Sequence, residues 1–112
     1  MFGDTITDPG AMIQGGLGLA PGANINPKGT SMFEPILGSA PKYKGLGFAK
    51  PIATILPVSL LPDHLGEHKA AAAVVSAIEK SIKDGVVTKD MGGIAGRAKA
   101  GSYIAECVKK GM

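Results

Sequence analysis

The chain has 112 residues, which is enough for one small domain and too few for two. Hydrophobic residues make up 45% and aromatic residues only 4%, with no tryptophan, so we expect an aliphatic core. The net charge is +3, but the lysines are scattered along the chain. A nucleic-acid-binding protein would show a basic stripe with aromatic platforms, so we expect no nucleic-acid partner.

Cys107 is the single cysteine of the chain, so no disulfide can form within it. This favours a reducing compartment. The stretch MFGDTITDPG lacks the basic and apolar regions of a secretory signal. The longest apolar stretch, IATILPVSLL, is interrupted by Pro57 and is too short to cross a bilayer. We therefore expect a cytoplasmic protein with no membrane partner.

The N-terminal half is rich in glycine and proline, and only short elements are predicted there. Asp8 as N-cap and Pro9 as first helical residue predict a helix over residues 9–15. A short strand is expected over 23–26 and another over 31–36, where Pro35 ends it. A long loop of small residues follows, and such loops are typical of functional sites or disorder.

The C-terminal half contains three apolar segments. Residues 52–65 are apolar enough for a buried helix, but Pro57 and Pro62 would each cost about 3 kcal/mol in a helix interior. We expect a kinked helix or two short pieces there. Periodicity predicts helices over 67–84 and over 96–110. The first of these has an apolar stripe made of Ala71, Val74, Val75, Ile78 and Ile82.

Two aspartates, Asp4 and Asp8, stand four residues apart near the start of the sequence. On a helix they would share a face and bind one hard divalent cation. Alternatively Asp8 caps a helix and Asp4 is a solvated turn residue, and the spacing together with Pro9 favours this alternative. Two carboxylates are too few to hold Mg²⁺ alone, so water, a substrate or another chain would complete the site.

Two other motifs give weaker signals, of which a zinc peptidase stays open as a third hypothesis that requires stoichiometric zinc. The string HLGEH, residues 64–68, matches the pattern of one class of zinc peptidases. Gly66 within it and Pro62 before it favour a turn between two helices over a zinc site. The glycines of GGLGLAPG do not have the spacing of a dinucleotide fingerprint.

The loop GSAPKYKG, residues 38–45, has a composition suited to a phosphorylated ligand. Its first residues are small and permit close approach to the backbone. Lys42, Tyr43 and Lys44 add two cations and a phenol, which favour a phosphate group. The alternative is a solvated surface loop, which the spacing by itself makes the simpler interpretation.

Taken in order, five segments resemble one protein family. The segments are FGDTITDPGAMIQGGLGLAPGANI, MFEPILGSAPKYKG, PIATIL, DHLGE and TKDMGG. They resemble the C-terminal part of the metal-dependent β-decarboxylating dehydrogenases, which include 3-isopropylmalate, isocitrate and tartrate dehydrogenases. The resemblance implies an α/β fold, namely the C-terminal half of the large domain of the isopropylmalate dehydrogenase-like fold. That half is helix-rich with a few short strands, so residues 1–112 would be an incomplete domain.

The resemblance also implies roles for named residues. Asp4 and Asp8 fall where the family binds Mg²⁺ or Mn²⁺, and Glu34 falls near the nicotinamide and the substrate. Lys50 stands where an asparagine usually meets the adenine. The loop that wraps the adenosine half of NAD or NADP comprises Gly38, Ser39, Ala40, Pro41, Lys42 and Tyr43. In this family an acidic residue at position 42 goes with NAD, so the Lys42–Tyr43 pair favours NADP.

The activity implied by the resemblance is the oxidative decarboxylation of a small 2-hydroxy acid by a homodimer. The substrate-binding arginines and the catalytic tyrosine and lysine of the family lie upstream, so we expect no catalytic residue in this segment. We expect the isolated chain to be inactive alone. The alternative is a non-catalytic, truncated paralogue that acts as a structural or subunit-pairing module, which Pro57 and Pro62 favour.

Overall fold

The computed structural model describes residues 2–13, 15–16, 19–47 and 49–111. Over these residues the chain is rich in helix and contains a short two-stranded sheet. The elements in chain order are α1 (Asp4–Ile13), β1 (Pro21–Asn24), β2 (Met32–Pro35), the 3₁₀ helix η2 (Pro41–Tyr43), α2 (Ile52–His64), α3 (His68–Lys83), the 3₁₀ helix η3 (Lys89–Met91) and α4 (Arg97–Gly111). The predicted helix-rich fold with a few short strands is confirmed.

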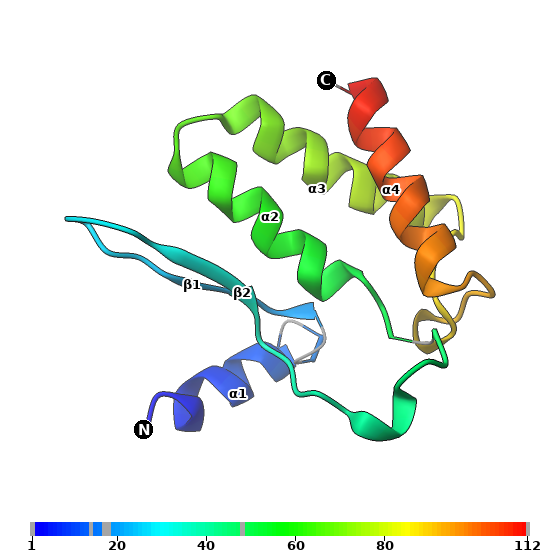
Figure 1. The fold of residues 1–112 in the computed structure, drawn as a ribbon, viewed down its shortest axis with the longest axis horizontal. Helices are drawn as coiled ribbons and strands as arrows, with labels where there is room; N and C mark the ends of the chain where they lie inside the picture. The colour runs from blue at the N-terminus through cyan, green and yellow to red at the C-terminus, as the bar shows by residue number, and fades with distance from the viewer. Residues whose placement is uncertain (1, 14, 17–18, 48, 112) are drawn as a thin grey trace.

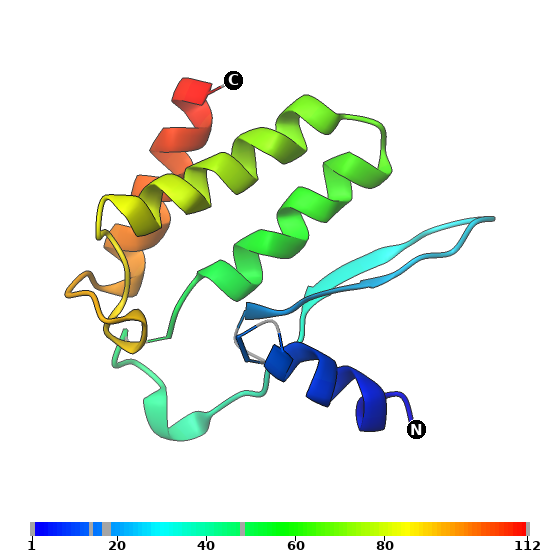
Figure 2. The same ribbon diagram turned by 180° about the vertical axis from the view of Figure 1, so that it is seen from behind.

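The elements are arranged in a row across the molecule (Figure 1). α4 packs against α3, α3 packs against α2, and the β1–β2 hairpin packs against the other side of α2. α1 lies beyond the hairpin, on the side away from α3 and α4, as the view from behind also shows (Figure 2). The core therefore lies among α2, α3 and α4.

The buried core is aliphatic, as the composition predicts. The central cluster consists of Ile52, Val74, Ala77, Ile78 and Ile104. Burial of such side chains is the main favourable term in folding, at about 25 cal/mol for each Å² of apolar surface removed from water. The three long helices thus form the stable part of the structure.

The helix α1 begins earlier than predicted, at Asp4, and Pro9 lies inside it. The amides of Ile6 and Thr7 both donate to the Gly3 carbonyl at 3.0 Å, which starts the helix before the proline is reached. The interpretation of Asp8 as N-cap is therefore wrong, because Asp8 is within the helix. Residue 14, in the predicted helix, lies outside the described residues.

The segment predicted as a kinked helix or two pieces is assigned as one helix, α2, with Pro57 and Pro62 inside it. The lost amide donors are offset by burial, since Pro57 is buried and α2 is packed against both the hairpin and α3. Ser59, also buried, donates its hydroxyl to the Leu56 carbonyl at 2.7 Å. The alternative of two separate pieces is wrong.

The strands form an antiparallel hairpin in which Pro21 is opposite Pro35 and Asn24 is opposite Met32. The second strand is confirmed, and Pro35 is its last residue. The first strand lies two residues earlier in the sequence than predicted, over Pro21–Asn24. The hairpin leads directly into the loop that carries the predicted cofactor residues.

The predicted helices over 67–84 and 96–110 are confirmed, with ends shifted by one residue. α3 ends just before Gly85, whose φ of +69° is readily adopted only by glycine. Within the predicted stripe Ala71, Val74 and Ile78 are buried, whereas the other two members, 75 and 82, are exposed.

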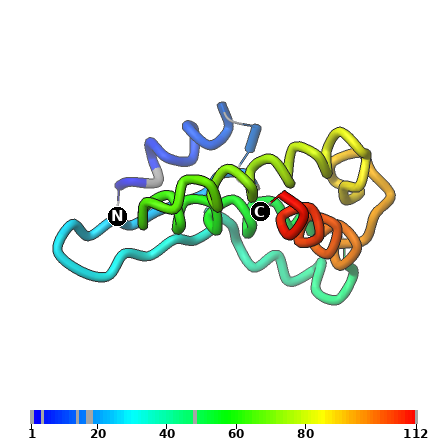
Figure 3. The backbone as a smooth tube through the Cα atoms, turned by 90° about the horizontal axis from the view of Figure 1, so that it is seen from above, coloured from blue at the N-terminus to red at the C-terminus, as the bar shows by residue number. Residues whose placement is uncertain are grey.

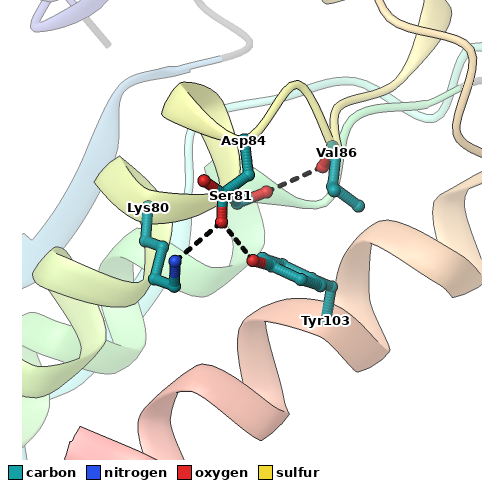
Figure 4. Close-up of polar contacts among 5 residues, drawn as sticks. All are labelled: Lys80, Ser81, Asp84, Val86 and Tyr103. Carbon is teal, nitrogen blue, oxygen red and sulfur yellow. Dashed lines mark hydrogen bonds and ion pairs between the residues drawn. The ribbon is translucent and has the colours of Figure 1, made fainter.

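A polar cluster ties α4 to the end of α3 (Figure 4). Asp84 Oδ2 accepts a hydrogen bond from Lys80 Nζ at 2.8 Å and another from the Tyr103 hydroxyl on α4. The hydrogen bonds from Lys80 and Tyr103 lower the pKa of Asp84, and the bond to Asp84 raises the pKa of Tyr103 to about 12. Beside them, Ser81 donates to the Val86 carbonyl at 2.7 Å. The cluster fixes the position of α4 relative to α3.

Candidate functional site

The loop between β2 and α2 contains the predicted cofactor residues and is shaped by local hydrogen bonds. Gly38 and Ser39 are exposed and precede Ala40, which has a φ of 38° and ψ of 62°. This left-handed conformation is uncommon for a residue with a side chain. It starts η2, in which the Tyr43 amide donates to the Ala40 carbonyl at 3.0 Å and the Lys44 amide to the Pro41 carbonyl at 3.1 Å. The loop therefore has a defined turn at its centre.

The side chains on this turn present positive charge to solvent. Lys42 Nζ lies 5.0 Å from the centre of the Tyr43 ring, a cation–π contact, and both side chains are exposed. Residues 35–62 include Lys42, Lys44 and Lys50 and no aspartate or glutamate. The loop is thus a local region of positive potential, which attracts anions such as phosphate.

Lys50 and Glu34 lie at the two ends of this loop. Lys50 is half-buried, directly before Pro51 and the start of α2. Glu34 is exposed on β2, and its Oε1 accepts a hydrogen bond from Asn24 Nδ2 across the hairpin at 3.3 Å. Both residues are close to the loop in sequence, and Glu34 has its carboxylate oriented by a neighbouring strand.

The aspartate pair lies on α1, one helical turn apart. The Asp4 side chain is not among the described groups, whereas Asp8 is exposed on the helix. Exposed carboxylate oxygens are suitable ligands for Mg²⁺ or Mn²⁺. Among the residues the structure describes, no group of three or more His, Cys, Asp or Glu is placed to hold a metal ion. The donor set fits part of a divalent metal site, and the remaining ligands would have to come from elsewhere.

The metal pair and the cofactor loop lie apart in this chain. Figure 1 draws α1 and η2 both below α2, and the view from above shows that they are separated from each other (Figure 3). α1 buries Ala11 alone among its described side chains, so it is weakly tied to the rest of the structure. The structure brings residues 38–43 together as one turn but does not bring them to Asp8.

The two histidines of HLGEH have separate partners. His64 Nε2 lies 3.5 Å from the Ser31 hydroxyl, and its ring is 5.6 Å from that of Phe33. His68 Nδ1 pairs with Asp63 Oδ1 at 2.7 Å. Gly66, with a φ of +85°, lies in the turn between α2 and α3, as predicted. The zinc peptidase interpretation has no support in this geometry.

One feature near the loop is not apparent in the sequence. Arg97, the first residue of α4, donates its amide to the Gly47 carbonyl at 3.1 Å, which places the segment before α4 beside the end of the loop. Lys89 lines the cavity between these segments. In the sequence, this region is marked only by TKDMGG, one of the segments that carry the family resemblance. Its contact with the loop has no sequence signal, because the two segments are far apart in the chain.

The comparisons with known proteins agree on one family. The model of the isocitrate/isopropylmalate dehydrogenase family matches residues 1–108. The chain is 41% identical over 112 residues to a probable tartrate dehydrogenase/decarboxylase of Bacillus subtilis, covering 98% of this chain and 32% of that protein. It is 46% identical over 110 residues to the 3-isopropylmalate dehydrogenase of Thermobifida fusca, covering 96% of this chain and 30% of that protein. The chain belongs to the isocitrate/isopropylmalate dehydrogenase family.

A solved structure supports the same family assignment at the level of the fold. The isocitrate dehydrogenase of Methylococcus capsulatus superposes with a TM-score of 0.85 at 38% identity, covering 97% of this chain and 33% of that one. The chain thus has the fold of part of an isocitrate dehydrogenase, and it spans about a third of the length of its relatives. Within the described residues, no helix has both the length and the apolar character to cross a membrane.

Proposed function

We propose that this chain supplies the cofactor loop and two metal ligands of an NAD(P)- and Mg²⁺- or Mn²⁺-dependent dehydrogenase. The reaction is the oxidative decarboxylation of a 2-hydroxy acid of the isopropylmalate or isocitrate type. The observation that carries the proposal is the turn at η2, where Ala40 is left-handed and Lys42 lies over the Tyr43 ring. The proposal includes a homodimer as the full-length assembly, as the family resemblance implies.

The loop binds the adenosine half of the cofactor in this proposal. Gly38, Ser39 and Ala40 have small side chains, so a ligand can approach the backbone closely. The turn is held by its own hydrogen bonds before the ligand arrives, which reduces the entropy lost on binding. Lys50 adds a further cation beside this loop, and Glu34 orients the nicotinamide end from β2.

The charge at position 42 favours NADP over NAD. The ammonium group of Lys42 attracts a 2′-phosphate, whereas a carboxylate at the same position would repel it and instead accept hydrogen bonds from the ribose hydroxyls. The Tyr43 ring in contact with Lys42 restricts the position of the ammonium group. Exposure of both side chains leaves them accessible to a ligand.

Asp4 and Asp8 would hold the divalent cation together with ligands from outside this chain segment. Their one-turn separation on α1 suits a shared ion, and the bound cation supplies a Lewis acid to the hydroxyl and carboxylate oxygens of the substrate. The family resemblance implies that the catalytic tyrosine and lysine lie upstream of this segment, so we expect no turnover of isopropylmalate or isocitrate by the chain alone. Absorbance of the reduced nicotinamide checks this.

The experiment that tests the cofactor proposal is a calorimetric titration of the chain with NADP⁺ and with NAD⁺. We expect tighter binding of NADP⁺, and we expect Lys42→Glu to weaken NADP⁺ about tenfold, which corresponds to about 1.4 kcal/mol. Lys28→Glu is the matched control, because Lys28 is also exposed but lies at the turn of the hairpin. Equal effects of the two substitutions, or no binding of either dinucleotide, would contradict the proposal.

The second candidate is a non-catalytic subunit-pairing module. The observation that favours it is the exposure of large apolar side chains on α1, where Ile6 is 79% and Ile13 is 89% exposed. This candidate predicts no change in melting temperature with NADP⁺, whereas a cofactor site raises it by mass action. The same thermal measurement therefore separates the two functions.

A further inference from the structure

The two faces of the β1–β2 hairpin differ in what they contact. Successive side chains of a strand project from opposite faces. Phe33 is half-buried, and its ring lies 5.6 Å from the ring of His64 at the end of α2, so this face is turned towards α2. Glu34, the next residue of β2, is exposed and projects from the other face, which we call the outer face. The Glu34 carboxylate is therefore open to a ligand.

Asn24 is the polar neighbour of Glu34 across the outer face. Gly22 is directly opposite Glu34 in the register of the hairpin, and Asn24 is the next residue along the same face of β1, opposite Met32. Gly22 has no side chain, and a Cβ atom there would lie 3.1 Å from the Glu34 carbonyl oxygen. The contact from β1 to the carboxylate thus comes from Asn24, whose Nδ2 donates to Glu34 Oε1 at 3.3 Å.

This hydrogen bond limits the positions that the Glu34 carboxylate can adopt. A glutamate side chain loses rotamer freedom when it is fixed, and a carboxylate that is already held loses less of that freedom when a ligand binds. The Asn24 amide is neutral, so its hydrogen bond does not cancel the negative charge of Glu34. The held carboxylate is therefore suited to a cationic group on a ligand, whose charge it attracts.

We propose that Asn24 is a positioning residue that holds the Glu34 carboxylate beside the nicotinamide ring and so favours binding of the oxidised cofactor. The nicotinamide ring carries a positive charge in the oxidised form only, and a nearby carboxylate stabilises that charge. The inference rests on the proposed function, in which Glu34 lies at the nicotinamide end of the cofactor. Asn24 acts through Glu34 and needs no contact of its own with the ligand.

The test compares NADP⁺ and NADPH by calorimetric titration of the chain. The two nucleotides share the adenosine half, so the ratio of the NADPH dissociation constant to the NADP⁺ dissociation constant reports the charge on the ring. We expect this ratio to be above one for the unmodified chain. Asn24→Ala should lower the ratio about threefold, because a hydrogen bond to a charged group is lost. Asn24→Gln retains the amide and should restore part of the ratio.

Met32→Ala is the matched control, because Met32 is exposed and is opposite Asn24 on the outer face. It should leave the ratio unchanged, since a loosened hairpin would weaken the binding of both nucleotides alike. Glu34→Gln should lower the ratio at least as far as Asn24→Ala, and adding Asn24→Ala to it should have no further effect. Asn24→Thr covers the case in which Asn24→Ala does not fold, because threonine suits a strand and cannot replace the amide donor.

An unchanged ratio in Asn24→Ala and Asn24→Thr would overturn the role of Asn24. A ratio of one in the unmodified chain would overturn it as well. In either case, tighter binding of NADP⁺ than of NAD⁺ would leave the proposed function standing. Failure of the unmodified chain to bind either NADP⁺ or NADPH would overturn both.

Discussion

The region formed by α2, α3 and α4 differs from the region formed by α1, the hairpin and the cofactor loop in how its apolar side chains are covered. In the helical region Ile78 is 5% exposed and Ile104 is 2% exposed. In α1, by contrast, Ile6 is 79% and Ile13 is 89% exposed. The helical region is therefore stabilised by its own packing, whereas α1 gains little from burial.

The proposed functional residues lie outside the stable core. The proposed metal ligands are on α1, and the proposed cofactor residues are in the loop between β2 and α2. Exposed loops and weakly packed elements often carry function on a rigid scaffold. Here the scaffold is the helical region, and the chain spans only about a third of its relatives.

The largest expected effect comes from removing core volume in the helical region. Ile104→Ala should reduce the free energy of unfolding by about 2–5 kcal/mol, because it leaves a cavity among α2, α3 and α4. Ile13→Ala is the matched control on α1 and should change it by about 0.5 kcal/mol or less. Urea denaturation measures both. Similar effects of the two substitutions would contradict the contrast between the regions.

A smaller effect is expected at the wall of the cavity. Gly93→Ala should destabilise the chain by about 1–3 kcal/mol, because the added Cβ would collide with the Val87 carbonyl. Gly96→Ala is the control, since a Cβ at Gly96 meets no atom within 4 Å. The comparison uses the same denaturation assay, and a neutral Gly93→Ala would show that this wall is not fixed.

The smallest effect concerns the contact between α3 and α4. The pKa of Tyr103 is raised to about 12 by its hydrogen bond to Asp84, so the folded chain holds this proton more tightly than the unfolded chain. The stabilisation is complete below about pH 10, the ordinary tyrosine value, and is lost as the pH rises towards 12. The difference in melting temperature between the chain and Tyr103→Phe should therefore shrink over that interval. A difference that stays constant would argue against the hydrogen bond.

Much of the helical region could be predicted from the sequence, because the periodicity of residues such as Val74 and Ile78 is local information. The predicted start of α1 is wrong. A residue before proline usually avoids the helical conformation, but amides that donate to the Gly3 carbonyl outweigh this preference. α2 is one helix despite Pro57 and Pro62, because tertiary burial overrides propensity.

The candidate site could be predicted only in part. The residues of the loop, from Gly38 to Tyr43, were indicated by composition and by resemblance to the family, and their roles remain proposals. The left-handed Ala40 has no sequence signal, because alanine rarely adopts that conformation. The cavity at Lys89 depends on the contact between Gly47 and Arg97, and periodicity carries no information on such long-range contacts.

The most direct test of the central claim is the set of backbone amide NMR shifts of the chain, recorded while NADP⁺ is added. We expect saturable shifts concentrated in residues 38–47 and 89–97, with α1 and the turn of the hairpin unaffected. Shifts confined to other elements, or none at saturating NADP⁺, would contradict the assignment of this loop to cofactor binding.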